Sequence, residues 1–227
     1  MCGRFALKTD VSALKKLFNI EAVTCDHAAD FNIAPADEVS AVIYRNGRRL
    51  GKLRWGLIPF WANDPFGGTK FINARSETLD TKPSFAQAFK KRRCLIPADG
   101  FYEWKRANRK KYPWFFTGTD EKPFLFAGIW DTWKKKGAAP VHSCAVITAE
   151  ASESVSPIHD RMPVILKEEV HDRWLDPGFN DMKRLKEILE ERVRLLRKYR
   201  VSSLVNSVKQ SGPELIRPID SRQSADS

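Results

Sequence analysis

The chain has 227 residues, of which 42% are hydrophobic, and this is enough apolar material for one sizeable buried core. Charges at Lys8, Asp10 and Lys15 argue against a secretory signal peptide, and no apolar run approaches the ~18 residues that cross a bilayer. The formal net charge of +11 favours a polyanionic partner, above all nucleic acid, over a membrane. We therefore expect a soluble monomer in the cytoplasm, associated with the nucleoid if the source is prokaryotic.

The cysteines are scattered, at Cys2, Cys25, Cys94 and Cys144, with no C-x-x-C pair. This spacing argues against a disulfide framework and against a Cys-based zinc site. Cys94 and Cys144 fall in apolar runs, which is typical of small buried hydrophobic residues. We expect neither a metal nor a cofactor.

In the first part of the chain, the hydrophobic pattern predicts a short helix, a hairpin and a second short helix. Thr9 or Asp10 can cap the first helix, Asn46-Gly47 suits the positive φ values of a type I′ hairpin turn, and the second helix begins near Ser84. The apolar positions that define these elements are Val11, Leu14, Leu17 and Phe18, then Val39, Ala41, Ile43, Leu53, Trp55 and Leu57, then Phe85, Ala88 and Phe89.

Strand-like runs dominate the middle of the chain, punctuated by Gly, Pro and Asp. They cover Cys94–Pro97, Tyr112–Thr117, Pro123–Trp130 and Ser143–Thr148. This pattern is typical of a largely antiparallel sheet or barrel. We predict an α+β fold, predominantly antiparallel β in a barrel-like sheet with a few short helices, as a single domain over residues 1–220 and a disordered tail over 221–227.

Near the C-terminus, apolar residues recur at helical spacing and predict a long helix over about 182–200. Its other face is strongly basic, and this face is either a solvated surface or a DNA-contacting one. Two closing strands are predicted after it, at Val201–Val205 and Glu214–Ile219.

Cys2 stands directly behind Met1. If Met1 is removed, the chain begins with a free amine and a thiol on adjacent carbons. The amine can form an imine with an aldehyde, and the thiol can then close a thiazolidine ring. An α-amino group has a pKa of about 7.7–8.0, so part of it is nucleophilic near neutral pH. The ordinary alternative is an incidental cysteine at a frayed chain end.

Aldehyde chemistry at Cys2 needs an acid, a proton shuttle and an orienting polar group. Asn73 follows a Gly-rich loop at 67–69, Glu103 lies among aromatic residues after a turn, and His159 lies in a loop bracketed by prolines. If Glu103 is buried, its apolar neighbours raise its pKa towards that of a general acid. Each residue also has a purely structural explanation, as a turn amide, a paired surface acid and an idle loop histidine.

Aromatic residues alternate with basic ones, as in proteins that stack single-stranded nucleic acid. Core packing explains most of these aromatics equally well. Trp61 is the exception, because it lies in the polar, Pro- and Gly-rich stretch from Pro59 to Gly68.

Several motifs, in order, resemble the SOS response-associated peptidase (SRAP) family from Cys2 to about Ile219. They are Cys2-Gly3-Arg4-Phe5, Phe31-Asn32-Ile33-Ala34-Pro35, Trp55-Gly56-Leu57-Ile58-Pro59, Ile72-Asn73-Ala74-Arg75-Ser76-Glu77, Ala98-Asp99-Gly100-Phe101-Tyr102-Glu103-Trp104, Ile158-His159-Asp160-Arg161-Met162-Pro163 and the closing Val205-Asn206-Ser207-Val208-Lys209 with Gly212-Pro213-Glu214-Leu215-Ile216.

The resemblance implies a β-rich domain that binds single-stranded DNA at abasic sites and crosslinks to the ring-opened sugar as a thiazolidine. It implies Cys2 as nucleophile, Asn73 as orienting group, Glu103 as acid and base, and His159 as proton shuttle. The resemblance also implies removal of Met1 by self-cleavage and a weak lyase activity. The resemblance further implies DNA contacts by a set of residues that comprises Arg4, Arg75, Thr148 and Arg161, to which Trp61 is added from its position.

The chain departs from the family at Trp61-Ala62, where some members carry two adjacent tryptophans, so one stacking wedge is absent. Two other functions stay open on the sequence. One is an N-terminal-nucleophile thiol peptidase or amidase that uses Cys2, and the other is a non-catalytic, basic module that binds single strands.

Overall fold

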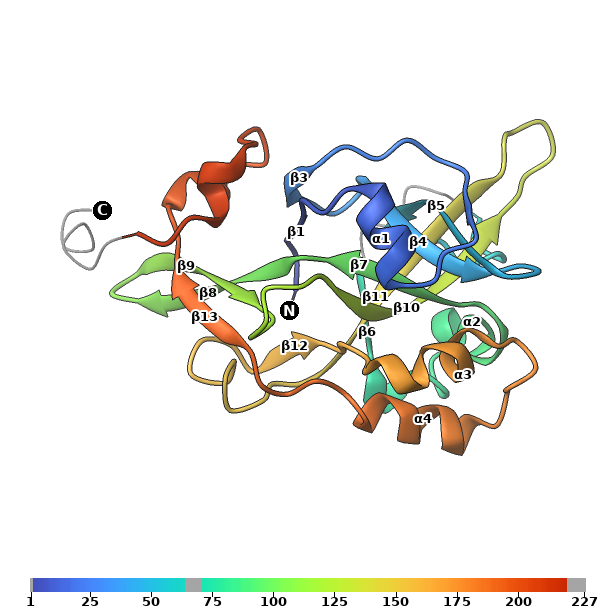
Figure 1. The fold of residues 1–227 in the computed structure, drawn as a ribbon. Coiled ribbons are helices and arrows are strands. Elements are labelled where there is room, and N and C mark those ends of the chain that lie inside the picture. Colours follow the sequence, from blue (N-terminus) through green and yellow to red (C-terminus); the bar gives the residue numbers. More distant parts are fainter. Residues whose placement is uncertain (1, 64–70, 220–227) are drawn as a thin grey trace.

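A computed structural model describes residues 2–63 and 71–219. Within these ranges, two β-sheets and a few short helices make up the fold (Figure 1). The predicted Gly-rich loop at 67–69 and the predicted disordered tail at 221–227 lie outside these described residues.

The strands are β1 (Phe5–Leu7), β2 (Ala22–Val23), β3 (Asp30–Ile33), β4 (Glu38–Tyr44), β5 (Arg48–Trp55), β6 (Asn73–Arg75), β7 (Arg93–Ala98), β8 (Gly100–Ala107), β9 (Lys110–Thr117), β10 (Phe124–Trp133), β11 (Val141–Glu150), β12 (Arg161–Pro163) and β13 (Arg197–Arg200). The smaller sheet has the order β13-β9-β8-β1-β3, and the larger has the order β12-β11-β10-β7-β4-β5-β2 with β6 beside β11. A further β11–β5 pairing closes the ring β5-β4-β7-β10-β11. The predicted α+β class with a barrel-like, mostly antiparallel sheet is confirmed.

The helices are α1 (Val11–Leu17), α2 (Pro83–Lys91), α3 (His171–Leu175) and α4 (Met182–Glu190), with 3-10 turns η2 (Ser76–Thr78), η3 (Glu168–Val170), η4 (Ser203–Asn206) and η5 (Pro213–Ile216). The two predicted early helices are confirmed. Asp10, rather than Thr9, caps α1 by accepting a hydrogen bond from the Ala13 N–H at 2.9 Å. Within the described residues, no helix has the length and apolar content needed to span a bilayer.

The main hydrophobic core lies inside the closed ring and draws on residues from Cys2 to Leu196. A smaller core packs beneath the other sheet, where Tyr102 and Phe115 contact Val205 and Leu215. Cys94 and Cys144 are fully buried as free thiols, as predicted from their apolar runs. Cys2 belongs to the main core, so the start of the chain is anchored rather than frayed.

The hairpin formed by β4 and β5 is confirmed, but its turn is longer than predicted. Tyr44 pairs with Arg48, which leaves Arg45, Asn46 and Gly47 in the loop. Asn46 and Gly47 both adopt positive φ, at 51° and 110°. The Asn-Gly pair therefore supplies the expected backbone conformation, but within a three-residue loop instead of a two-residue type I′ turn.

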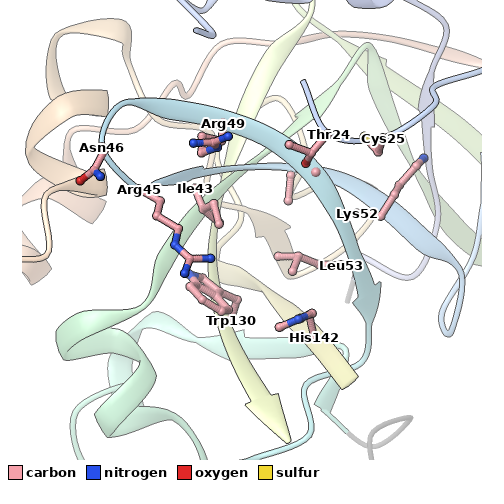
Figure 2. Close-up of a pocket in the computed structure, with 12 residues that line it drawn as sticks. Thr24, Cys25, Ile43, Arg45, Asn46, Arg49, Lys52, Leu53, Trp130 and His142 are labelled. Atoms are coloured by element: carbon pink, nitrogen blue, oxygen red, sulfur yellow. The ribbon is translucent and has the colours of Figure 1, made fainter. Parts of the chain in front are cut away.

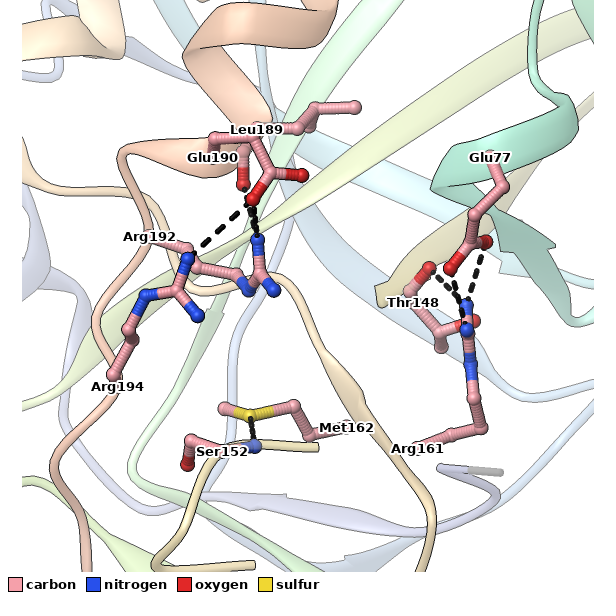
Figure 3. Close-up of polar contacts among 9 residues, drawn as sticks. All are labelled: Glu77, Thr148, Ser152, Arg161, Met162, Leu189, Glu190, Arg192 and Arg194. Carbon is pink, nitrogen blue, oxygen red and sulfur yellow. Dashed lines mark hydrogen bonds and ion pairs between the residues drawn. The ribbon is translucent and has the colours of Figure 1, made fainter. Parts of the chain in front are cut away.

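The predicted long helix over 182–200 is wrong beyond Glu190. α4 ends there, and the chain then forms the edge strand β13. The Val193 N–H donates to the Ile165 carbonyl at 2.8 Å, and Arg192 folds back onto Glu190 at 2.6 Å (Figure 3). β13 then pairs with the open edge of β9. Tertiary strand pairing thus overrides the local helical spacing.

The two predicted closing strands are also wrong. Residues 203–206 and 213–216 form η4 and η5 instead. The Ser202 side chain caps η4 by accepting from the Leu204 N–H, and Pro213 begins η5. One apolar residue from each turn, Val205 and Leu215, is buried in the smaller core, which a turn achieves without a strand partner.

Candidate active site

Cys2 lies just before β1, which Figure 1 labels, and belongs to the main hydrophobic core. β1 pairs with β3 on one side and β8 on the other, through Phe5 opposite Ile33 and Phe101. The Cys2 side chain is fully buried, with Sγ 3.8 Å from the Arg4 carbonyl oxygen. Burial, reinforced by the nearby Glu103 carboxylate, raises the pKa of this thiol.

The turn between β7 and β8 fixes how β8 lies against β1. Asp99 accepts hydrogen bonds from the backbone N–H groups of Lys8 and Thr9 at 2.6 and 2.9 Å, and from the Thr9 hydroxyl at 2.6 Å. Gly100 leaves room for the neighbouring strand, because a Cβ there would lie 2.2 Å from the Phe115 ring. These contacts set the register that brings Glu103 beside the start of the chain.

Asn73 reaches Cys2 from β6, which runs parallel to β11. Its Nδ2 donates a hydrogen bond to the Cys2 carbonyl oxygen at 2.7 Å. The Asn73 Oδ1 is buried, and it has no hydrogen-bond partner among the described residues. One side of this amide therefore holds the main chain at Cys2, while the other is available to a ligand.

Glu103 projects from β8 and is 3% exposed. The backbone pairing of Tyr102 N–H with the Arg4 carbonyl, at 3.0 Å, sets Glu103 alongside the Cys2–Arg4 segment. Burial raises the pKa of this carboxyl to about 7, as the apolar flanking residues predict. A carboxyl with this pKa is present in both protonation states near neutral pH, which suits a group that gives and takes a proton.

His159 lies in the loop before β12 and faces Glu103. Its Nε2 is 3.9 Å from the Glu103 Oε2. The other ring nitrogen, Nδ1, accepts the Arg161 backbone N–H at 2.9 Å and also lies 2.9 Å from the Asp160 carboxylate. Burial lowers the pKa of His159, so the imidazole is a proton acceptor near neutral pH. Cys2, Asn73, Glu103 and His159 thus lie together at one site.

Arg161, on β12, follows His159 by two residues and contacts Thr148 on β11 (Figure 3). Glu77 accepts two hydrogen bonds from the Arg161 guanidinium, at 2.6 and 3.0 Å, and the Thr148 carbonyl accepts a third at 2.7 Å. Sequence reasoning missed this role of Glu77, because a pair separated by so much chain has no local signal. The Thr148 hydroxyl is buried, and no described residue bonds to it.

The remaining predicted DNA contacts differ in accessibility. Arg4 is buried and donates to Asn32 Oδ1 at 2.6 Å and to the Val205 carbonyl at 2.9 Å, so its guanidinium is used inside the fold. Arg75 is exposed on β6, and Trp61 is 53% exposed. Arg75 and Trp61 are the members of this set that solvent reaches most easily, and direct contact of each with DNA stays a prediction.

The described residues contain no group of three or more His, Cys, Asp or Glu side chains arranged to hold a metal ion. The polar atoms of the site are instead a thiol, an amide, a carboxyl and an imidazole, which together suit proton transfer and nucleophilic addition.

Comparison with known proteins shows the family of the chain. The family model described as SOS response associated peptidase (SRAP) matches residues 1–208. The chain belongs to the SRAP family. This confirms the resemblance seen in the sequence motifs.

The proteins to which the chain is similar include bacterial and vertebrate ones. The abasic site processing protein YoqW of Bacillus subtilis is 42% identical over 221 residues, covering 95% of this chain and 99% of YoqW. The abasic site processing protein HMCES of Xenopus tropicalis is 33% identical, covering 76% of this chain and 58% of that protein. A crystal structure of a Bacteroides thetaiotaomicron protein superposes with a TM-score of 0.84 at 22% identity, covering 96% of this chain and all of that one, which shows a shared fold.

Proposed function

We propose that this protein processes abasic sites in single-stranded DNA by forming a covalent thiazolidine through Cys2. The observation that carries the proposal is the convergence of Cys2, Asn73, Glu103 and His159 on one buried site. The names of the relatives, which are abasic site processing proteins, agree with this substrate. The net charge of +11 suits a DNA strand.

The reaction requires that Met1 be removed, by Cys2 itself or by an aminopeptidase, because Met1 otherwise holds the Cys2 amine in a peptide bond. An abasic sugar is mostly a cyclic hemiacetal, whose ring must open to expose the aldehyde. Glu103, with a pKa near 7, donates a proton to the ring oxygen as the hemiacetal hydroxyl loses its proton.

The Cys2 amine then adds to the aldehyde carbon and water leaves, which gives an imine. The Cys2 thiol adds to the same carbon, its proton passes to the nitrogen, and a thiazolidine forms. His159, neutral because burial lowers its pKa, carries protons in these steps. Overall, one amine, one thiol and one aldehyde give one thiazolidine and one water. The imine also allows β-elimination, so weak strand cleavage accompanies the crosslink.

The burial of Cys2 argues for this order of steps over a thiol peptidase. A peptidase needs a thiolate, which a lowered pKa supplies. In this protein burial raises the pKa of the Cys2 thiol. The amine is therefore the group that reacts first, and the thiol follows once the imine is in place.

A denaturing gel tests the proposal. The mature protein is incubated with a single-stranded oligonucleotide that carries one abasic site, and we expect a heat-stable protein–DNA band. Cys2→Ser should abolish that band and keep some strand cleavage through the amine, whereas Cys25→Ser serves as a matched control and should behave as wild type. A stable band that persists in Cys2→Ser overturns the thiazolidine mechanism.

A further inference from the structure

A groove of about 720 Å³ lies between the β4–β5 hairpin, the segment that follows β2, and the β10–β11 pair (Figure 2). None of the described residues that line it belongs to the Cys2 site. His142 lines the groove near the start of β11, and Thr148, which contacts Arg161 two residues after His159, lies near the end of that strand. At about 3.3 Å per residue, the two positions are about 20 Å apart along the strand.

The groove combines positive charge with an apolar floor. Arg45, Arg49 and Lys52 supply the charge, and Leu53 and Trp130 supply apolar surface. In Figure 2 the Arg45 side chain extends from the hairpin toward the Trp130 indole. Within the described part of the chain, neither Arg45 nor Arg49 forms an ion pair, and no carboxylate lines the groove. The carboxylates of Asp26 and Glu38 interact electrostatically with Cys25. Cys25 lies at the end of the groove opposite Arg45 (Figure 2).

The indole of Trp130 is held in place by its neighbours. The His142 ring lies 6.4 Å from it between centroids, with an interplanar angle of 60°. His142 is in turn fixed by Thr132, whose hydroxyl lies 2.9 Å from Nδ1. A held aromatic ring beside unpaired guanidinium groups is the arrangement on which single-stranded nucleic acids stack a base and neutralise a phosphate.

We propose that this groove binds a nucleotide of single-stranded DNA, with its base against Trp130 and its phosphate on Arg45 and Arg49. The volume of the groove is in the range of small-molecule sites, so it accommodates one nucleotide. The proposal rests on the DNA-binding function proposed above and adds a second contact on the same strand, remote from Cys2. The anionic backbone and flat bases of the strand match both the charge and the aromatic surface of the groove.

Fluorescence anisotropy with labelled oligothymidylate that lacks an abasic site tests this contact. We compare strands of about 4 and about 16 nucleotides, the limits of common single-strand site sizes. Arg45→Glu/Arg49→Glu should weaken binding of the long strand about 10-fold and of the short strand less than 2-fold. It should also reduce the salt slope by about 1.4, because each single-strand phosphate contact contributes about 0.7. Lys15→Glu/Lys16→Glu, on exposed positions of α1, is the control with the same charge change.

Wild-type affinity of Arg45→Glu/Arg49→Glu for the long strand overturns the proposal, as does an equal loss in the Lys15→Glu/Lys16→Glu control. A duplex of the same length that binds as tightly, and loses as much, overturns the stacking on Trp130. Crosslinking of a short abasic strand is measured in parallel. If the groove variant crosslinks like wild type, the Cys2 chemistry is supported independently of the result for the groove. If neither wild type nor variant crosslinks, the proposed function fails, whatever the binding data show for the groove.

Discussion

The Asn73 side-chain amide donates a hydrogen bond to the Cys2 carbonyl oxygen at 2.7 Å. This contact joins β6 to the first residues of the chain, which lead into β1 of the other sheet. It holds the main chain at the residue whose amine and thiol must both reach one carbon. An anchored chain start reduces the conformational freedom that a reactive terminus would otherwise lose on binding its substrate.

Asn73→Ala should slow crosslinking about 10- to 100-fold, because it releases the Cys2 carbonyl and misplaces the nucleophile. The single-turnover rate of adduct formation on a denaturing gel measures this. Asn108→Asp, in the exposed β8–β9 turn, is the control. Thermal unfolding of each variant separates positioning from stability, and an unchanged rate in a folded Asn73→Ala protein would remove the orienting role.

The raised pKa of Glu103, together with the pKa of the Cys2 amine, predicts a bell-shaped pH dependence of crosslinking. The Glu103 carboxyl, with a pKa of about 7, loses the proton needed for ring opening as the pH rises. The Cys2 amine gains reactivity as the pH rises through about 7.7–8.0. We expect a rate maximum between about pH 7 and pH 8. Glu103→Gln should be slower in crosslink formation and reversal and should keep only the rising limb, while Glu153→Gln keeps both limbs. A falling limb retained in Glu103→Gln would assign it to another group.

The same carboxyl should reduce stability at higher pH. Because burial raises the folded pKa from the usual glutamate value of 4.5 to about 7, the folded state holds more protons than the unfolded state between these values. Wild-type stability therefore falls as the pH rises through this window. Urea unfolding should show Glu103→Gln gaining up to about 3 kcal/mol relative to wild type at pH 8 compared with pH 4. An equal difference at both pH values would contradict the raised pKa.

Gly100→Ala should destabilise the fold by about 3 kcal/mol or more, since the added methyl would lie 2.2 Å from the Phe115 ring and 2.5 Å from the Phe116 carbonyl oxygen. Gly178→Ala is the control, because its nearest contact is the end of the Asp176 side chain at 3.1 Å. Urea denaturation compares the two. A loss below about 1 kcal/mol would mean that β8 and β9 separate easily.

Local patterns predicted much of the fold. The Asp10 cap, the amphipathic segment near Ser84 and the alternation on either side of Asn46-Gly47 each specify an element through contacts within a few residues. The same reasoning failed over 182–200. Helical spacing continues there, but the open edge of β9 offers backbone hydrogen bonds that a local pattern does not reveal.

The motif residues Cys2, Asn73, Glu103 and His159 were all identifiable in the sequence, and their proximity was not. Their types specify a chemistry, and the ordered motifs specify the family. Only strand pairing, of β1 with β8, β6 with β11 and β12 with β11, brings them together, because hydrogen bonds between distant segments depend on the whole sheet. Burial likewise depends on every neighbour at once, so the tertiary structure alone raised the pKa of Glu103 and turned Arg4 and Arg161 toward internal partners.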